Sequence, residues 1–319
     1  MRTSAERRKV RFTAGDTECA AWHCAGTNGG CVIMAGGGGV TKEPGTDPFA
    51  ARFHAAGSTV LAFDYRRLGE SGGRPRQTVR IKDQLADWQS AISFAATTLP
   101  DVDPARIAVW GFSLSGGHVL RVAARDPRLA AAIAQTPNAD GPAASRNATR
   151  HQKPLAMLRL TGRVLRDVAG GLLGRPPVPV PLAGEPGTVA MLTTPDGIDG
   201  DRALNPGNRY PERQQAVAAR SVFGIALHRP GRDAPRVRIA LLVLVRDQDL
   251  TALSELAVRV AERAPRAEPV RLPGGHYAPF LDQYEPAVEA ELSFLRRHLL
   301  DPAPAGRPAA TDAPPVRRS

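Results

Sequence analysis

One segment near the middle of the chain constrains the fold more than any other, because it joins an apolar strand to a helix through a serine. Residues 107–112 are apolar and predict a buried strand, and residues 116–124 predict a helix. Between them runs Gly-Phe-Ser-Leu-Ser-Gly-Gly over 111–117. A serine on a tight strand-to-helix turn is the setting of a nucleophile elbow above a mostly parallel sheet. The segment therefore predicts an α/β fold with Ser113 as a catalytic nucleophile.

The residues around Ser113 fit the steric demands of this turn. A strained central residue needs small neighbours two positions before and two positions after it, and Gly111 and Ser115 occupy these positions. The following helix directs the positive end of its dipole at the serine, which favours negative charge there. The alternative is a Gly/Ser-rich turn that only joins a strand to a helix. Ser115 is the competing serine, but we expect it one step into the helix and facing away from the turn.

Predicted strands alternate with predicted helices along most of the chain, which is typical of a largely parallel sheet with helices on both faces. The expected strands are 9–13, 19–24, 31–35, 60–65, 107–112, 129–135, 239–245 and 270–272. The expected helices are 47–56, 81–95, 116–124, 253–264 and 287–299. We therefore predict an α/β core.

The alternation is lost between Pro137 and Pro235, which predicts an insertion. Within it we expect helices over 155–168 and 213–227 and a loop or extended stretch over 170–186. The first helix could present one apolar face, made of Leu155, Leu158, Leu165 and Val168. The predicted organisation is a core over 8–136 and 236–300, an inserted cap over 137–235 that forms the substrate pocket, and a disordered Pro/Ala-rich tail over 301–319.

A serine hydroxyl at its ordinary pKa is a weak nucleophile and needs a neighbouring base. Of the seven histidines, only His276 follows a short strand near the end of the core, in a loop whose glycines can bring the ring over the sheet edge. His118 follows Ser113 closely but lies on the helix, where we expect it to point away. His151 and His228 lie in the insertion and could touch substrate. His276 is therefore the predicted base.

The base needs an orienting carboxylate. The strand that ends at Val245 leads into Arg-Asp-Gln-Asp over 246–249, so two aspartates emerge at the carboxyl edge of the sheet, where the active sites of such folds lie. Two carboxylates separated by one residue cannot both face the same ring. We favour Asp249, which lies a turn's length beyond the strand, and Asp247 is the alternative.

The oxygen that becomes negative during attack on a carbonyl needs two preorganised backbone N–H donors. One donor is expected from Leu114, directly after the nucleophile. The other is expected from the glycine run 36–39, with Gly38 as the candidate. Four glycines after a strand could also suggest a phosphate loop. However, the run has neither the Lys-Ser/Thr ending of a P-loop nor a complete G-x-G-x-x-G, so we expect no bound nucleotide.

The amino-acid composition limits which binding partners and which cellular location we expect. The formal net charge of the 319 residues is +11, but the basic residues are nearly all arginines scattered among Ala, Pro and Gly, without a nucleic-acid-binding motif. No run reaches the ~18 apolar residues of a membrane span, and the N-terminus lacks the apolar stretch of a secretory signal. We expect a cytoplasmic protein with no nucleic-acid and no membrane partner. Cys19, Cys24 and Cys31 are expected as apolar core residues rather than disulfide or zinc ligands.

Several segments together resemble the α/β-hydrolase superfamily, and most closely its dienelactone-hydrolase-like and polyketide-transferase-like branch. The resemblance is carried by residues 32–37, 63–71 (Phe-Asp-Tyr-Arg-Arg-Leu-Gly-Glu-Ser), 74–77, 110–118, 135–137 and 274–277 (Gly-Gly-His-Tyr). It implies an eight-stranded sheet, a Ser–Asp–His triad and usually no metal or organic cofactor. Two positions depart from the family pattern: Gly36 stands where a histidine is common, and Arg246 stands where a glycine usually follows the acid strand.

These residues predict a serine hydrolase that cleaves a carboxylic ester, thioester or lactone through an acyl-serine intermediate. One alternative is acyl transfer from the same acyl-enzyme to an acceptor in secondary metabolism, with the cap excluding water. The other is a non-catalytic binding protein that reuses the fold. The expected partner is a small-molecule acyl substrate, the expected cofactors and metals are none, and a homodimer is left open.

Overall fold

The computed structural model describes residues 7–210 and 214–300 of the chain. Its centre is an eight-stranded sheet in the order β1-β2-β4-β3-β5-β6-β9-β10. The strands are β1 Arg7–Ala14, β2 Thr17–Cys24, β3 Cys31–Ala35, β4 Thr59–Phe63, β5 Ile107–Phe112, β6 Ala131–Gln135, β9 Ala240–Arg246 and β10 Ala267–Leu272. β2 pairs antiparallel with β1 and β4, and all other neighbours are parallel. The predicted mostly parallel sheet of eight strands is confirmed.

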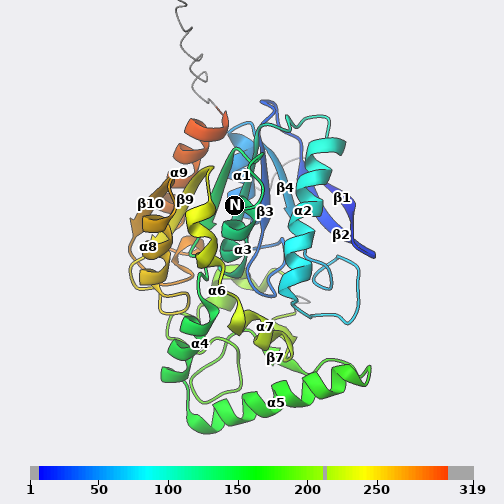
Figure 1. The fold of residues 1–319 in the computed structure, drawn as a ribbon, viewed down its shortest axis with the longest axis vertical. Helices are drawn as coiled ribbons and strands as arrows, with labels where there is room; N and C mark the ends of the chain where they lie inside the picture. Colours follow the sequence, from blue (N-terminus) through cyan, green and yellow to red (C-terminus); the bar gives the residue numbers. More distant parts are fainter. Residues whose placement is uncertain (1–6, 211–213, 301–319) are drawn as a thin grey trace, which may run out of the picture.

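Helices cover both faces of this sheet (Figure 1). They are α1 Asp47–Ala55, α2 Ile81–Thr98, α3 Leu114–Ala123, α8 Ser254–Arg263 and α9 Tyr284–Leu295, the last of which continues into a π-helical turn at Arg296–Leu300. The central strands are buried on both faces, as parallel strands between helices must be. Along β3, for example, Ile33 belongs to the cluster under α2, α3 and α8, while Met34 belongs to the cluster under α1 and α9.

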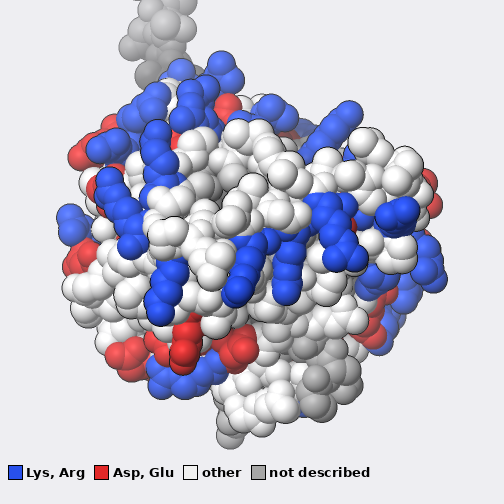
Figure 2. Space-filling view, turned by 90° about the horizontal axis from the view of Figure 1, so that it is seen from below, with Lys and Arg blue, Asp and Glu red and all other residues white. Residues whose placement is uncertain are grey.

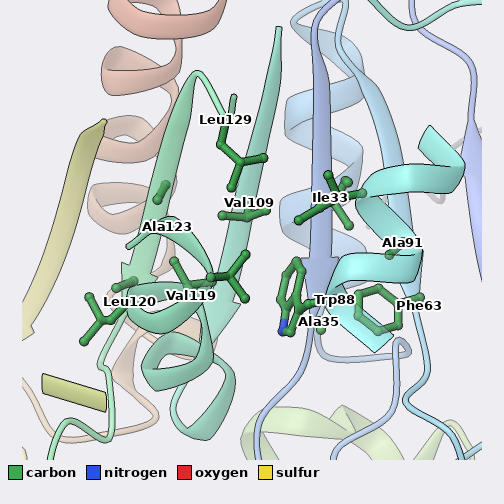
Figure 3. Close-up of a cluster of buried hydrophobic side chains, with 14 of the residues drawn as sticks. Ile33, Ala35, Phe63, Trp88, Ala91, Val109, Val119, Leu120, Ala123 and Leu129 are labelled. Atoms are coloured by element: carbon green, nitrogen blue, oxygen red, sulfur yellow. The ribbon is translucent and has the colours of Figure 1, made fainter. Parts of the chain in front are cut away.

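The larger of these two clusters packs α2 and α3 against the central strands. Trp88 of α2 and Val119 of α3 are fully buried against Ile33 of β3 and Val109 of β5, which are register partners (Figure 3). Because β3, β5, β6, β9 and β10 are parallel, their carboxyl ends meet at one edge of the sheet. The loops that follow β3, β5, β9 and β10 therefore lie near one another.

Residues 137–235 form a different kind of structure, which we call the 137–235 segment. Its elements are α4 Gly141–Arg150, α5 Pro154–Leu172, β7 Pro179–Pro181, α6 Gly200–Leu204, β8 Ala216–Ala218, α7 Ser221–Leu227, and 3-10 turns at Pro206–Asn208 and Pro230–Arg236. It lies beyond the carboxyl edge of the sheet, with α5 as its outermost helix (Figure 1). It contributes no strand to the main sheet, because β7 and β8 pair only with each other in the described part of the chain.

The predictions for this segment are partly wrong. The helix expected over 213–227 is instead β8 followed by the shorter α7, and Arg213 lies outside the described residues. Alanine-rich sequence favours a helix locally, but Ala218 donates a backbone hydrogen bond to Gln77, and β8 pairs with β7. α5 also extends four residues beyond the expected end, into the stretch expected to be a loop.

Two smaller expectations have different outcomes. Cys19, Cys24 and Cys31 are buried, as expected of core residues. The tail expected to be disordered, 301–319, lies outside the described residues. Across the described ranges, no helix is both long enough and apolar enough to cross a membrane.

Candidate active site

Ser113 lies in the tight turn between β5 and α3. Its backbone φ of 56° is in the left-handed region, which residues other than glycine rarely adopt, so the turn holds Ser113 under strain. The Ser113 N–H donates to the Gln135 carbonyl at 3.0 Å, and the Ser113 carbonyl accepts from the N–H groups of Gly117 and Asn138. A side chain at position 111 would collide with the backbone of Ser115, which explains the glycine there. The backbone therefore presents the serine oxygen at the sheet edge.

The structure brings three of the predicted residues into one hydrogen-bonded series. The hydroxyl oxygen of Ser113 lies 2.9 Å from Nε2 of His276. On the other side of the ring, Nδ1 of His276 lies 2.9 Å from Oδ2 of Asp249. His276 is fully buried, and Asp249 is nearly so. Each residue follows a different strand, namely β5, β9 and β10.

The structure distinguishes the two candidate carboxylates by their surroundings. Asp249 contacts His276 and also accepts a hydrogen bond from the Ala252 N–H at 2.7 Å. Asp247 is exposed and forms an ion pair with Arg271 at 2.7 Å. Only Asp249 is therefore placed to orient the imidazole.

A third carboxylate, which the sequence analysis did not single out, joins the 137–235 segment to this series. Asp196 accepts hydrogen bonds from the backbone N–H groups of Leu250, Thr251 and His276 at 2.8, 3.3 and 3.1 Å, and from the Thr251 hydroxyl at 2.9 Å. Gly275 leaves room for it, since a Cβ there would lie 2.7 Å from the Cβ of Asp196. One side chain thus holds the loops of Asp249 and His276 together. Asp196 sits in a Thr-Pro-Asp-Gly turn, which in sequence resembles any other loop.

The charges around His276 set its proton affinity. Burial lowers the pKa of His276, but the carboxylates of Asp249 and Asp196 raise it, and the net shift is upward. Burial raises the pKa of Asp196, but His276 and the donors from Leu250 and Thr194 lower it, with a net downward shift. Asp196 is therefore held as a carboxylate, and both acids favour a proton on the ring.

The glycine run after β3 lies beside the serine. Gly37, Gly38, Ser113 and Leu114 line the same pocket. A Cβ on Gly37 would lie 3.2 Å from the Cβ of Ser113, and a Cβ on Gly38 would lie 3.4 Å from Leu114. Leu114 is the first residue of α3, where an N–H has no acceptor within the helix.

Ser115 lies one step into α3, as expected, and does not line the pocket of Ser113. Its buried hydroxyl donates to the Gly36 carbonyl and contacts the Tyr65 hydroxyl. Trp88 in turn donates from its indole N–H to Tyr65 at 2.8 Å. Ser115 therefore ties α3 to the glycine run, and its oxygen is already engaged in this network.

Arg246, one of the two departures from the family pattern, supports the loop of His276. Its side chain is buried and donates to the Pro273 carbonyl at 3.2 Å. Burial lowers the pKa of Arg246 to about 10, and burial raises the pKa of the nearby Glu291 to about 8. A glycine at this position could not make the contact with Pro273.

The pocket above Ser113 has two kinds of wall. The core contributes Ser113 and the glycine run, together with Thr251 and Tyr277. The 137–235 segment contributes a mostly apolar wall, whose larger members are Leu182, Met191, Leu192, Leu204, Val222 and Ile225. A mostly apolar pocket with the Ser113 hydroxyl at its base suits an acyl chain held with its carbonyl at Ser113.

The two histidines of the 137–235 segment do not line this pocket, against the expectation that they could touch substrate. His228 is buried, with its Nε2 3.2 Å from Nδ1 of His118. The Nε2 of His118 lies 2.9 Å from the Gln84 side-chain oxygen, so His118 points away from Ser113 as predicted. Burial lowers the pKa of both histidines. In the described part of the chain, no cluster of three or more His, Cys, Asp or Glu side chains could hold a metal ion.

A serine, a histidine and a carboxylate in series at the carboxyl edge of an eight-stranded, mostly parallel sheet define the α/β hydrolase class of proteins. Comparison of the sequence with models of protein families shows which family of α/β hydrolases the chain belongs to. The family model described as "Serine aminopeptidase, S33" matches residues 28–219, which is more than half of the chain. The chain belongs to this family of α/β hydrolases.

Individual relatives agree with this assignment. The chain is 39% identical over 293 residues to the quorum-quenching protein AidA of Acinetobacter baumannii, covering 90% of this chain and 94% of that protein. It is 33% identical over 163 residues to the polyketide transferase ATR5 of Stachybotrys chlorohalonatus, covering 51% of this chain and 52% of that protein. It is 31% identical over 163 residues to a thiohydrolase of Eupenicillium brefeldianum, covering 51% of this chain and 50% of that protein.

A solved structure supports the fold. The α/β hydrolase GrgF from Penicillium superposes with a TM-score of 0.75 over 92% of this chain and 99% of its own, at 24% identity. Family and relatives together identify the chain as a serine hydrolase that acts on ester-type bonds.

Proposed function

We propose that the chain cleaves its substrate through an acyl-Ser113 intermediate, with His276 as base and Asp249 as the orienting acid. The observation that carries this proposal is the series of two 2.9 Å contacts from Ser113 through His276 to Asp249. The Ser113 oxygen attacks the carbonyl carbon while Nε2 of His276 accepts the hydroxyl proton. His276 then gives that proton to the departing alcohol or thiol as the bond to the carbonyl carbon breaks.

The second half of the reaction uses the same groups. His276 accepts a proton from a water molecule, whose oxygen attacks the acyl carbon. As the bond from the acyl carbon to the Ser113 oxygen breaks, His276 gives that proton to the serine oxygen, and the free acid leaves. Asp249 holds Nδ1–H toward itself, so that Nε2 is free to accept a proton in both steps. Leu114 and Gly38 are the proposed N–H donors to the negative oxygen, with support from their place beside Ser113.

The proposed substrate is a small molecule with an apolar acyl group joined as an ester, thioester or lactone. The apolar wall of Leu182, Met191 and Ile225 supports the acyl group. The names of the relatives, a quorum-quenching protein and a thiohydrolase, support small acyl compounds as the class. The 137–235 segment then acts as the cap of the pocket. A cytoplasmic location and a homodimer stay predictions.

Hydrolysis of p-nitrophenyl esters of increasing acyl length tests the proposal. The unaltered chain should release p-nitrophenol, and Ser113→Ala should abolish the release while leaving the melting temperature close to that of the unaltered chain. A fluorophosphonate probe should label the unaltered chain but not the variant. Undiminished turnover by Ser113→Ala would show that another residue is the nucleophile.

Acyl transfer is the second candidate, because the base is fully buried beneath the 137–235 segment. A site that limits water lets an acceptor alcohol or amine attack the acyl-enzyme instead. The name of the polyketide transferase relative agrees with this reaction. Product analysis with added acceptors separates the two: acylated acceptor supports transfer, whereas free acid alone counts against it.

A further inference from the structure

The outer face of α5 exposes a row of leucines that the molecule itself does not cover. Leu155, Leu158, Leu165 and Leu172 are 57%, 69%, 59% and 86% exposed. Their spacing places them on one side of the helix, which we call the leucine stripe. The opposite side packs inward, where Val164 is buried against Val180 and Ala219. The apolar face that the sequence predicts for this helix therefore points to solvent.

This stripe lies in a strongly basic part of the chain. Residues 141–175 hold seven basic residues and a single acidic one. The acid, Asp167, is buried and paired with Arg220 at 2.8 Å, so it does not offset the charge of the surface. Arg159, Arg163 and Arg166 are exposed beside the stripe. Basic side chains and uncharged surface make up most of this end of the molecule (Figure 2).

We propose that α5 binds the surface of an anionic phospholipid bilayer, with the leucine stripe entering the headgroup boundary and the arginines pairing with lipid phosphates. A helix with one apolar face and Arg along its flank is suited to lie in that plane. At 19 residues, α5 offers about 28 Å of such a face. It is the outermost element at its end of the molecule, so a flat surface can reach it (Figure 1). The expectation of no membrane partner is revised for this peripheral mode of contact.

A second copy of the chain is a less suitable occupant of the stripe. Two such faces would bring two sets of exposed arginines together without exposed acids on α5 to pair with them, and like charges repel. The positions between the leucines are Gly162 and Ala169, which supply no side chains large enough to pack into a facing helix. A lipid surface needs no such matching shape and carries the opposite charge.

Vesicle flotation of the full chain tests the proposal, using phosphatidylcholine vesicles with and without phosphatidylglycerol. One variant removes the charge beside the stripe, Arg159→Gln/Arg163→Gln/Arg166→Gln, and a second removes apolar area, Leu158→Ser/Leu165→Ser. The matched control removes three exposed arginines on and just after α8, Arg259→Gln/Arg263→Gln/Arg266→Gln. Turnover of a water-soluble ester reports whether each variant is folded, since none of these residues lines the pocket.

The unaltered chain should float only with vesicles that contain phosphatidylglycerol, and added salt should weaken this binding. The α5 arginine variant should bind more than about ten-fold more weakly, because each surface arginine contributes about 1 kcal/mol at such a membrane. The leucine variant should also bind more than about ten-fold more weakly, because two leucines no longer bury apolar area at the headgroup boundary. The α8 control should bind like the unaltered chain. The proposal would be overturned if the α5 arginine variant and the α8 control lost vesicle binding equally. It would also be overturned if the unaltered chain did not bind. A dimer in sedimentation equilibrium that Leu158→Ser/Leu165→Ser dissociates would overturn it as well.

Discussion

The sheet core and the 137–235 segment differ in how they are packed and in what they contribute to the site. In the core, parallel strands buried on both faces bring Ser113, Asp249 and His276 to one edge. In the segment, a small cluster around Val164, Val180 and Ala219 buries the inner side of α5, while the outer side exposes its leucines. The difference teaches that the placement of the reacting groups follows from the sheet, whereas the shape offered to the substrate follows from packing around it. Asp196 crosses this division, because it belongs to the segment but holds the loops of the core.

The largest effect should come from the acid that the core places against the base. Asp249→Asn should lower kcat by about 10⁴-fold, because an amide lets the imidazole adopt the wrong tautomer. Asp247→Asn is the matched control and should leave kcat unchanged, since Asp247 contacts Arg271 on the surface. Steady-state kinetics on one soluble ester measures both. A comparable loss in the Asp247 variant would mean that the core does not distinguish the two aspartates.

Asp196 gives the next largest effect and tests whether the segment contributes to the chemistry. Asp196→Asn should lower kcat by roughly thirty-fold, equivalent to about 2 kcal/mol of hydrogen bonding to a charged group. It should also move the pH profile. His276 must be neutral to accept the serine proton, and the Asp196 carboxylate raises the pKa of His276. Removing that charge lowers this pKa, so the acid limb of kcat/KM should shift to lower pH.

Asp199→Asn is the control for this experiment, because Asp199 belongs to the same stretch but pairs only with Arg202 in the described structure. It should leave both kcat and the acid limb in place. If Asp196→Asn lowered kcat while the acid limb stayed where it was, Asp196 would act only by holding the loops. If Asp196→Asn left kcat unchanged, the 137–235 segment would have no part in the chemical steps.

The core could be predicted from the sequence because its signals are local. Apolar runs mark β3, β5 and β9, and the order of Ser113, the aspartates and His276 follows from the strands that precede them. The neighbours of His276 could not be predicted equally well. Asp196 reaches His276 across 80 positions of sequence, from a turn without periodicity. Only tertiary packing decides that contact.

In the 137–235 segment, helix propensity led to one wrong prediction. Its alanine-rich stretch before Ser221 indicated a helix, but pairing with β7 and a hydrogen bond to Gln77 make it a strand. Its leucine periodicity indicated a helix correctly but said nothing about which face is covered. Periodicity identifies a face, and the partner of that face has to come from the structure.

The apolar wall should control selectivity with a smaller effect. Ile225→Ala should lower kcat/KM for long acyl esters by about ten-fold, since each lost methylene contact is worth about 1–3 kcal/mol, and should leave short esters unaffected. Phe223→Ala is the control on the same helix, because Phe223 is 55% exposed and does not line the pocket. Kinetics over a series of acyl lengths measures both. A uniform loss for short and long esters would place Ile225 in the support of the core instead.

The smallest expected effect on kcat concerns the glycine run 36–39, which residues of both regions contact. Ser115 ties Gly36 to the core, while Val217 and Leu182 of the segment pack where a side chain on Gly39 would lie. Ser115→Ala removes a buried hydrogen bond worth about 1 kcal/mol, and a loosened run should lower kcat by about five-fold with KM unchanged. Val217→Ala removes apolar contact and should lower the free energy of unfolding by about 1 kcal/mol with kcat nearly intact. If Val217→Ala lowered kcat more than Ser115→Ala, the segment rather than the core would position the proposed N–H donor, and the division of labour between the two regions would have to be redrawn.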